Sequence, residues 1–168
     1  SQRGSPWASQ PEWTSPPMIR CVASLLAAAL LAAPAARADC FDWDAAQVHE
    51  GTLRGLPPGP LRWRVGLSAA GGIHQATSVE VAWVAQDGQA WRQTLFEEIQ
   101  DGRPSLRLRR GRLELRVTYC ERGGGCRGVT LPYAWHHAAR RFAGIGRSAR
   151  ESLAAACGSV PEPVTPPA

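Results

Sequence analysis

The chain has 168 residues and carries 19 basic side chains, all of them arginine, against 14 acidic ones. Its formal net charge of +5 falls to about +3 over residues 39–168, which is too mild a balance to indicate a nucleic-acid partner. Those residues are enough for one domain with a hydrophobic core but not for two.

Residues 18–38 have the pattern of a secretory signal peptide. A short basic start at 18–20 leads into an uncharged apolar run at 21–33, and Ala36 and Ala38 frame a small-residue cleavage site. The apolar run holds 13 residues, whereas a membrane helix needs about 20. We therefore expect cleavage after Ala38, export to the periplasm or the exterior, and no transmembrane segment.

The rest of the chain divides into three predicted parts. Residues 1–17 contain no methionine and several prolines, so we expect an unstructured leader upstream of the true start at Met18. Residues 39–158 are predicted to form one disulfide-stapled β domain. The proline-rich residues 159–168 are predicted to be a disordered tail.

Four cysteines remain after removal of the signal, and an oxidising compartment favours disulfides over thiols. Three pairings are possible. We favour Cys120–Cys126, which encloses three flexible glycines, together with Cys40–Cys157, which joins the two ends of the domain. A single C-x5-C spacing is a weak zinc pattern, and the C-x-x-C redox spacing is absent. No metal and no cofactor are therefore expected.

Alternation of apolar and polar residues dominates from Val48 to Gly146 and predicts antiparallel strands, after a short helical turn within residues 42–50. Asp87-Gly88 is a strong hairpin signal. The alternation assigns two sets of side chains to a buried face: Leu61, Trp63, Val65 and Leu67 in the first strand, and Val79, Val81 and Trp83 in the next.

A two-residue turn at Arg110-Gly111 gives the most detailed prediction. It sets Leu108 opposite Leu113 and Leu106 opposite Leu115, with all four on the apolar face. The same register pairs Arg107 with Glu114 on the other face, which is a favourable cross-strand contact.

The last elements are predicted from local signals. Pro132 cannot donate a ladder hydrogen bond, so the strand at 129–135 is expected to be an edge or bulged, with a short return strand after it. Ser148 and Glu151 form a capping-box pattern and Gly158 is a helix stop, which predicts a C-terminal helix. The predicted fold is all-β: a small antiparallel sandwich or barrel-like meander of about six to eight strands with one C-terminal helix.

Two groups of polar side chains are candidate binding residues. His136, His137, Arg140 and Arg141 lie within residues 134–142 and could capture an anion; the alternative is a polar hairpin tip. Arg107, Arg109, Arg112 and Arg116 could form a basic stripe; the alternative is a solvated sheet face. Trp91, beside a hairpin turn, is a candidate exposed aromatic for a carbohydrate or protein contact.

No catalytic motif appears in the sequence, so we expect an exported, non-enzymatic binding module, such as an inhibitor or envelope adaptor. Its partner would be a protein or an anionic ligand of the envelope or the exterior. One alternative is a small exported hydrolase that uses His136 or His137 with a carboxylate; the other is a polyanion binder that uses the arginine stripe.

Overall fold

The computed structural model describes residues 40–165. The predicted leader, the signal peptide with its cleavage site, and residues 166–168 lie outside the described residues. Among the described residues, no helix is long and apolar enough to span a membrane.

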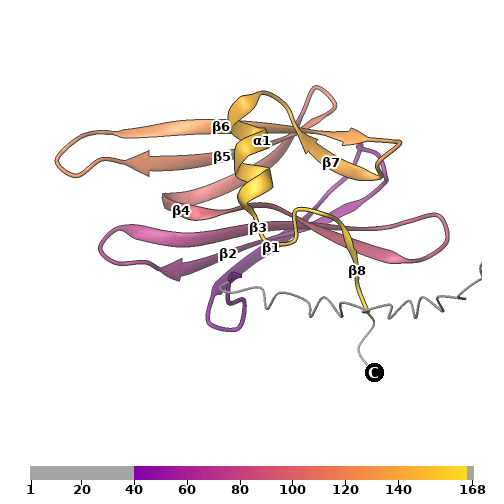
Figure 1. The fold of residues 1–168 in the computed structure, drawn as a ribbon, viewed down its shortest axis with the longest axis horizontal. Coiled ribbons are helices and arrows are strands. Elements are labelled where there is room, and N and C mark those ends of the chain that lie inside the picture. The colour runs from indigo at the N-terminus through magenta and orange to yellow at the C-terminus, as the bar shows by residue number, and fades with distance from the viewer. Residues whose placement is uncertain (1–39, 166–168) are drawn as a thin grey trace, which may run out of the picture. The chain divides into compact units, whose positions relative to one another are not determined.

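The described chain forms an antiparallel meander, which confirms the predicted fold class (Figure 1). Seven strands pair in chain order, and a short eighth strand pairs with the fourth. The elements are β1 (Gln47–Leu53), β2 (Leu61–Ala69), β3 (His74–Val84), β4 (Ala90–Arg109), β5 (Arg112–Cys120), β6 (Cys126–His136), β7 (Arg141–Gly144), α1 (Arg147–Ala155) and β8 (Glu162–Pro163).

The predicted strand registers are confirmed where they were specified. Across the β4–β5 turn, Leu108 lies opposite Leu113, Leu106 opposite Leu115 and Arg107 opposite Glu114. The β3–β4 turn holds three residues, 86–88, because the Ala85 N–H donates to the Gln89 carbonyl across it, 2.9 Å away.

The hydrophobic core is built from the apolar positions of β2 to β7, because alternation turns every second side chain inward. Trp63 is only half-buried, but the other side chains predicted for the inner face of β2 and β3 are buried. The largest contributions to the core come from Leu61, Val65, Leu67, Val79, Val81, Trp83, Leu95, Phe96, Leu113, Leu115, Val117, Leu131, Tyr133 and Phe142.

The sheet curls, so that strands distant in the pairing order meet. A register shift between Val79 and Glu80 marks an irregularity where β3 pairs with β4, and such irregularities increase strand bending. The fully buried side-chain amide of Gln93 on β4 accepts from the Phe142 N–H of β7 at 2.8 Å and donates to the Phe142 carbonyl at 2.9 Å. The Gln93 amide thus pairs the backbone N–H and carbonyl of Phe142 on the outer edge of β7, as a neighbouring strand would.

The prediction for Pro132 is wrong: β6 is not an edge strand and its pairing with β5 shows no register shift. The Pro132 carbonyl accepts from the Ile145 N–H at 2.8 Å, so the backbone of Pro132 faces the β7 side. Strand β7 has already ended at Gly144. The β6–β7 pairing ends at Tyr133 and Gly144, so the missing N–H of Pro132 removes no hydrogen bond from that pairing.

The C-terminal helix is present, but its predicted ends are wrong. The N-cap is Gly146, with φ of 80° and no side-chain cap hydrogen bond, so Ser148 lies inside the first turn. Glu151 pairs instead with Arg147 at 2.7 Å, one turn away on the same face. The C-cap is Ala156, so the residue directly after the cap is Cys157, and the predicted stop Gly158 lies one residue further on.

Close packing explains why α1 begins where it does. A Cβ atom added at Gly144 would lie 2.5 Å from the carbonyl carbon of Ala149 in the helix. Only glycine allows the helix backbone to approach the strand this closely. Packing against β7 thus positions the helix in place of a capping side chain.

Both ends of the described chain pack onto the sheet. The predicted helical turn is limited to one hydrogen-bonded turn, in which the Ala46 N–H donates to the Trp43 carbonyl at 3.4 Å, and strand β1 follows directly. The segment expected to be a disordered tail contains β8, which pairs with Trp91 and Arg92 of β4. Glu162 in β8 also forms an ion pair with Arg92 at 2.9 Å. The proline content that predicted a disordered tail gives no information about this strand pairing or this ion pair.

The predicted disulfide pairing is confirmed. The bond between Cys40 and Cys157 joins Cα atoms 5.7 Å apart, and the bond between Cys120 and Cys126 joins Cα atoms 4.1 Å apart. The first closes the domain end to end. The second pins the β5–β6 turn.

Candidate ligand-binding cleft

A cleft of about 990 Å³ opens at one end of the curled sheet. One side comes from the β3–β4 hairpin, which contributes Trp83 and Trp91, and the facing side from the β6–β7 hairpin, which contributes Trp135. The β1–β2 loop adds Pro57 and Pro58. Curled antiparallel sheets commonly bind small molecules at such mouths.

The aromatic residues of the cleft are held by packing. Trp83 and Trp91 form a direct cross-strand pair. Trp83 is 5% exposed and meets Trp135 edge-on, with ring centroids 5.2 Å apart. Trp135 in turn contacts Phe142 at 5.2 Å. Trp91 and Trp135 remain half-buried, so part of each indole is accessible at a site whose shape is already fixed.

The cationic side of the cleft is the loop between β6 and β7. His137, Arg140 and Arg141 line the cleft, and all three are exposed. Arg140 adopts the left-handed conformation with φ of 49°, and its N–H donates to the His137 carbonyl at 3.3 Å. Among the described residues, no carboxylate forms an ion pair with Arg140 or Arg141.

The structure therefore brings together four of the residues selected from the sequence: Trp91, His137, Arg140 and Arg141. His136 does not line the cleft. Its Nδ1 atom accepts from the Ala139 N–H at 3.1 Å, which stabilises the loop itself. Sequence reasoning missed Trp83 and Trp135 as lining residues because alternation assigned both of them to the core.

The predicted arginine stripe lies elsewhere, on the outer face of β4 and β5. Arg107 forms an ion pair with Glu114 at 3.0 Å, and Arg116 lies opposite Thr130. Arg109 lies directly opposite Arg112, a like-charge pair that costs stability. None of these four arginines lines the cleft.

The hydrolase alternative would need a histidine and a carboxylate in contact. The cleft is lined by both His137 and Asp87. The Asp87 carboxylate accepts from the Gln89 N–H at 3.0 Å within its own turn, and no hydrogen bond joins it to His137 among the described residues. The cleft thus contains both residue types without the contact that general acid–base catalysis uses.

A second histidine–carboxylate pair lies outside the cleft. His74 Nδ1 lies 2.6 Å from the carboxylate of Asp101, which is 4% exposed. The other oxygen of Asp101 accepts from the Cys120 N–H at 2.6 Å. The pair ties β3, β4 and β5 together beside the pinned turn. Sequence reasoning missed it because the contact depends on the register between β3 and β4.

Glu98 joins three elements in the same way. Its carboxylate accepts from the Tyr119 hydroxyl at 2.9 Å and from the Ser152 hydroxyl of α1 at 2.6 Å. Burial raises the pKa of Tyr119, and the neighbouring Glu98 raises it further. Burial likewise raises the pKa of Tyr133, whose hydroxyl donates to the Leu95 carbonyl at 3.0 Å.

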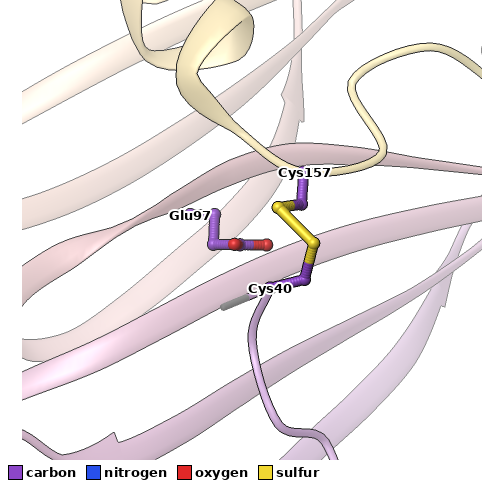
Figure 2. A group of neighbouring side chains, drawn as sticks. All are labelled: Cys40, Glu97 and Cys157. Atoms are coloured by element: carbon purple, nitrogen blue, oxygen red, sulfur yellow. A yellow bond between two sulfur atoms is a disulfide. The ribbon is translucent and has the colours of Figure 1, made fainter. Parts of the chain in front are cut away.

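Figure 2 shows the third cluster, in which the carboxylate of Glu97 points toward the Cys40–Cys157 disulfide. One potential ligand atom from each residue lies within 4.8 Å of the others. Metal binding by cysteine requires the thiolate, and here both sulfur atoms are bonded to each other. Glu97 accepts from the Phe41 N–H at 3.3 Å, and burial raises its pKa. With the disulfide formed, the cluster is a structural contact between the two ends of the domain.

No family model, no curated protein and no solved structure matches the chain. The chemistry of the cleft is therefore the basis for assigning a function.

Proposed function

We propose that this protein is a non-enzymatic binding module of the bacterial periplasm or exterior, and that the cleft holds its ligand. The observation that carries the proposal is the composition of that cleft: three packed tryptophans line it together with two arginines that have no ion-pair partner among the described residues. Apolar walls with a few convergent polar groups are typical of ligand sites.

Export is supported by two independent features. Residues 18–38 have the three-part pattern of a cleaved signal peptide. The domain also contains two disulfides, which persist in oxidising compartments and are rare in the cytosol.

Binding is favoured over hydrolysis because of how the polar groups near the cleft are used. General bases act on protons within about 2.6–3.2 Å and are oriented by a partner. His137 has no such partner among the described residues, and Asp87 is engaged in its own turn. An inhibitor or adaptor that holds a ligand without transforming it needs neither.

The proposal is tested on protein recovered from a bacterial host expressing the chain from Met18. Intact mass should show a chain that begins at Asp39 and resists thiol alkylation until a reductant is added. Native mass spectrometry should show a fraction of that protein carrying a bound small molecule. An uncleaved chain with reactive thiols contradicts export, and a ligand-free protein from every fraction counts against the cleft.

Polyanion binding is a second candidate, favoured by the like-charge pair of Arg109 and Arg112. Their repulsion would be relieved by a bound anion. Retention on a heparin column above physiological salt, lost on Arg109→Ser with Arg112→Ser, would support it. Elution near or below physiological salt would contradict it.

A further inference from the structure

We infer that the cleft selects organic anions that carry a ring with a flat apolar face, with that face against the tryptophans and the acid group on Arg140 and Arg141. This inference rests on the proposed binding function and names its ligand class. The ring could be that of an aromatic acid or of a sugar acid, since both present a flat apolar face to an indole.

The requirement for a ring comes from the aromatic wall. Trp91 and Trp135 approach the cleft from opposite hairpins, and the nearly buried Trp83 lies between them in the packing. Their positions are fixed by cross-strand pairing and edge-on contacts. A flat group can lie against such indoles without displacing core side chains.

The requirement for an anion comes from the loop. Arg140 and Arg141 are consecutive, exposed and without a carboxylate partner among the described residues, and, unlike the other arginines that lack one there, they line the cleft. A guanidinium can bind a carboxylate or phosphate through two parallel hydrogen bonds. A single anionic group at this loop would satisfy the unpaired charge.

The backbone of Arg140 provides a control for the role of its side chain. Its φ of 49° lies in the left-handed region, where glycine or asparagine is preferred and an arginine is strained. Arg110 has nearly the same conformation, with φ of 50°, in the β4–β5 turn away from the cleft.

This coincidence supplies a matched pair of variants. Arg140→Gly and Arg110→Gly each remove one positive charge and relieve the same backbone strain, so both should fold at least as well as the parent protein. Only Arg140→Gly removes a cationic group from the cleft. A loss of binding in that variant alone cannot be attributed to misfolding or to a change in net charge.

The experiment is calorimetric titration of the exported protein with naphthoate and with galacturonate, each beside its uncharged counterpart, naphthamide or galactose. At least one of the two acids should bind roughly tenfold or more tightly than its counterpart. The acid that binds identifies the source of the ring. Arg140→Gly should weaken that acid by a similar factor, and Arg110→Gly should leave it unchanged.

Three outcomes overturn the inference. Equal binding of an acid and its uncharged counterpart would show an apolar cleft without anion selection, and the proposed function would stand. Equal weakening by both glycine variants would show a general charge effect. If neither acid binds, the ligand class is wrong; the proposed function fails with it only if native mass spectrometry also finds no bound molecule.

Discussion

The polar groups at the two ends of β6 differ in whether they have partners within the fold. At the end that begins with Cys126, the turn is pinned by a disulfide, and Asp101 binds both His74 and the Cys120 N–H beside it. At the end that leads into Arg140, exposed cations surround a cleft and have no carboxylate partner among the described residues. Both ends belong to one continuous sheet (Figure 1).

The difference separates structural polar groups from groups available to a ligand. A buried carboxylate must find partners within the fold, because an unpaired buried charge is costly. An exposed arginine is solvated by water and needs no partner within the fold. Charge alone therefore does not identify a binding site; Arg140 and Arg141 stand out because they line the cleft.

The largest expected effect comes from the disulfides. Replacing Cys40 and Cys157 by serine opens a closure that spans 117 residues and should lower the free energy of unfolding by about 5 kcal/mol, because the unfolded chain gains freedom. The same change at Cys120 and Cys126, which lie 6 apart, should cost about 2 kcal/mol. Urea unfolding of both variants measures this. A larger cost at the pinned turn would contradict the account.

The next effect concerns the buried Gln93, which joins β4 to β7. Gln93→Leu leaves the buried N–H and carbonyl of Phe142 without partners, and we expect a loss of about 2–4 kcal/mol. Hydrogen exchange at the Phe142 amide should accelerate with it. Gln47→Leu, at an exposed position on β1, is the control and should change stability little. An unchanged Gln93→Leu protein would mean that another contact closes the sheet.

The two ends of β6, the one pinned by the disulfide and the one beside the cleft, can be compared by the stability cost of replacing one carboxylate at each. Asp101→Asn weakens the contact with His74 and should cost about 1–3 kcal/mol, because Asp101 is buried. Asp87→Asn at the rim of the cleft should cost less than about 0.5 kcal/mol, because its side chain is exposed. Chemical denaturation measures both. Equal costs would remove the distinction between the two ends.

Alkaline pH should unfold the protein through its two tyrosines, Tyr119 and Tyr133. Burial raises the pKa of both hydroxyls in the folded chain above the ordinary value of 10.0. The unfolded chain therefore loses these protons first, so stability is intact below pH 10 and falls as the pH rises above it. Tyrosinate absorbance should appear together with loss of the native circular dichroism. Ionisation near pH 10 in a folded protein would contradict this.

The two turn substitutions should have small effects of the opposite sign. Arg110→Gly and Arg140→Gly should each raise the free energy of unfolding by about 0.5–1 kcal/mol, because the strain of a left-handed arginine is removed. Thermal melts of the two variants should shift upward by similar amounts. A destabilised Arg140→Gly protein would show that its side chain supports the fold.

The sequence was informative wherever one strand and its neighbour decide the structure. The turn at Arg110-Gly111 placed Leu113 and Leu115 opposite the correct residues. The expected oxidising compartment, together with the sequence distances, predicted both disulfides. The contacts that build the cleft are of another kind: Trp83 on β3 meets Trp135 on β6 because the sheet curls. Alternation assigns a side chain to a face, but it does not say which distant strand the curl brings to that face.

Local signals failed where tertiary packing outweighed them. The capping pattern at Ser148 was overridden because Gly144 lets α1 approach β7 closely and Gly146 provides the turn into it. Pro132 was accommodated in an inner strand because β7 ends beside it. The exposed arginine cluster was recognisable in the sequence, but its lack of internal partners was visible only in the fold.

The central claim is that a ligand binds in the cleft, and the indole N–H resonances of the tryptophans test it most directly. The described residues contain five tryptophans, of which Trp83, Trp91 and Trp135 line the cleft and Trp43 and Trp63 do not. Titration of ¹⁵N-labelled protein with whichever of naphthoate and galacturonate binds should shift the first three signals and leave the other two in place. Shifts confined to Trp43 and Trp63 would contradict the account and place the ligand outside the cleft.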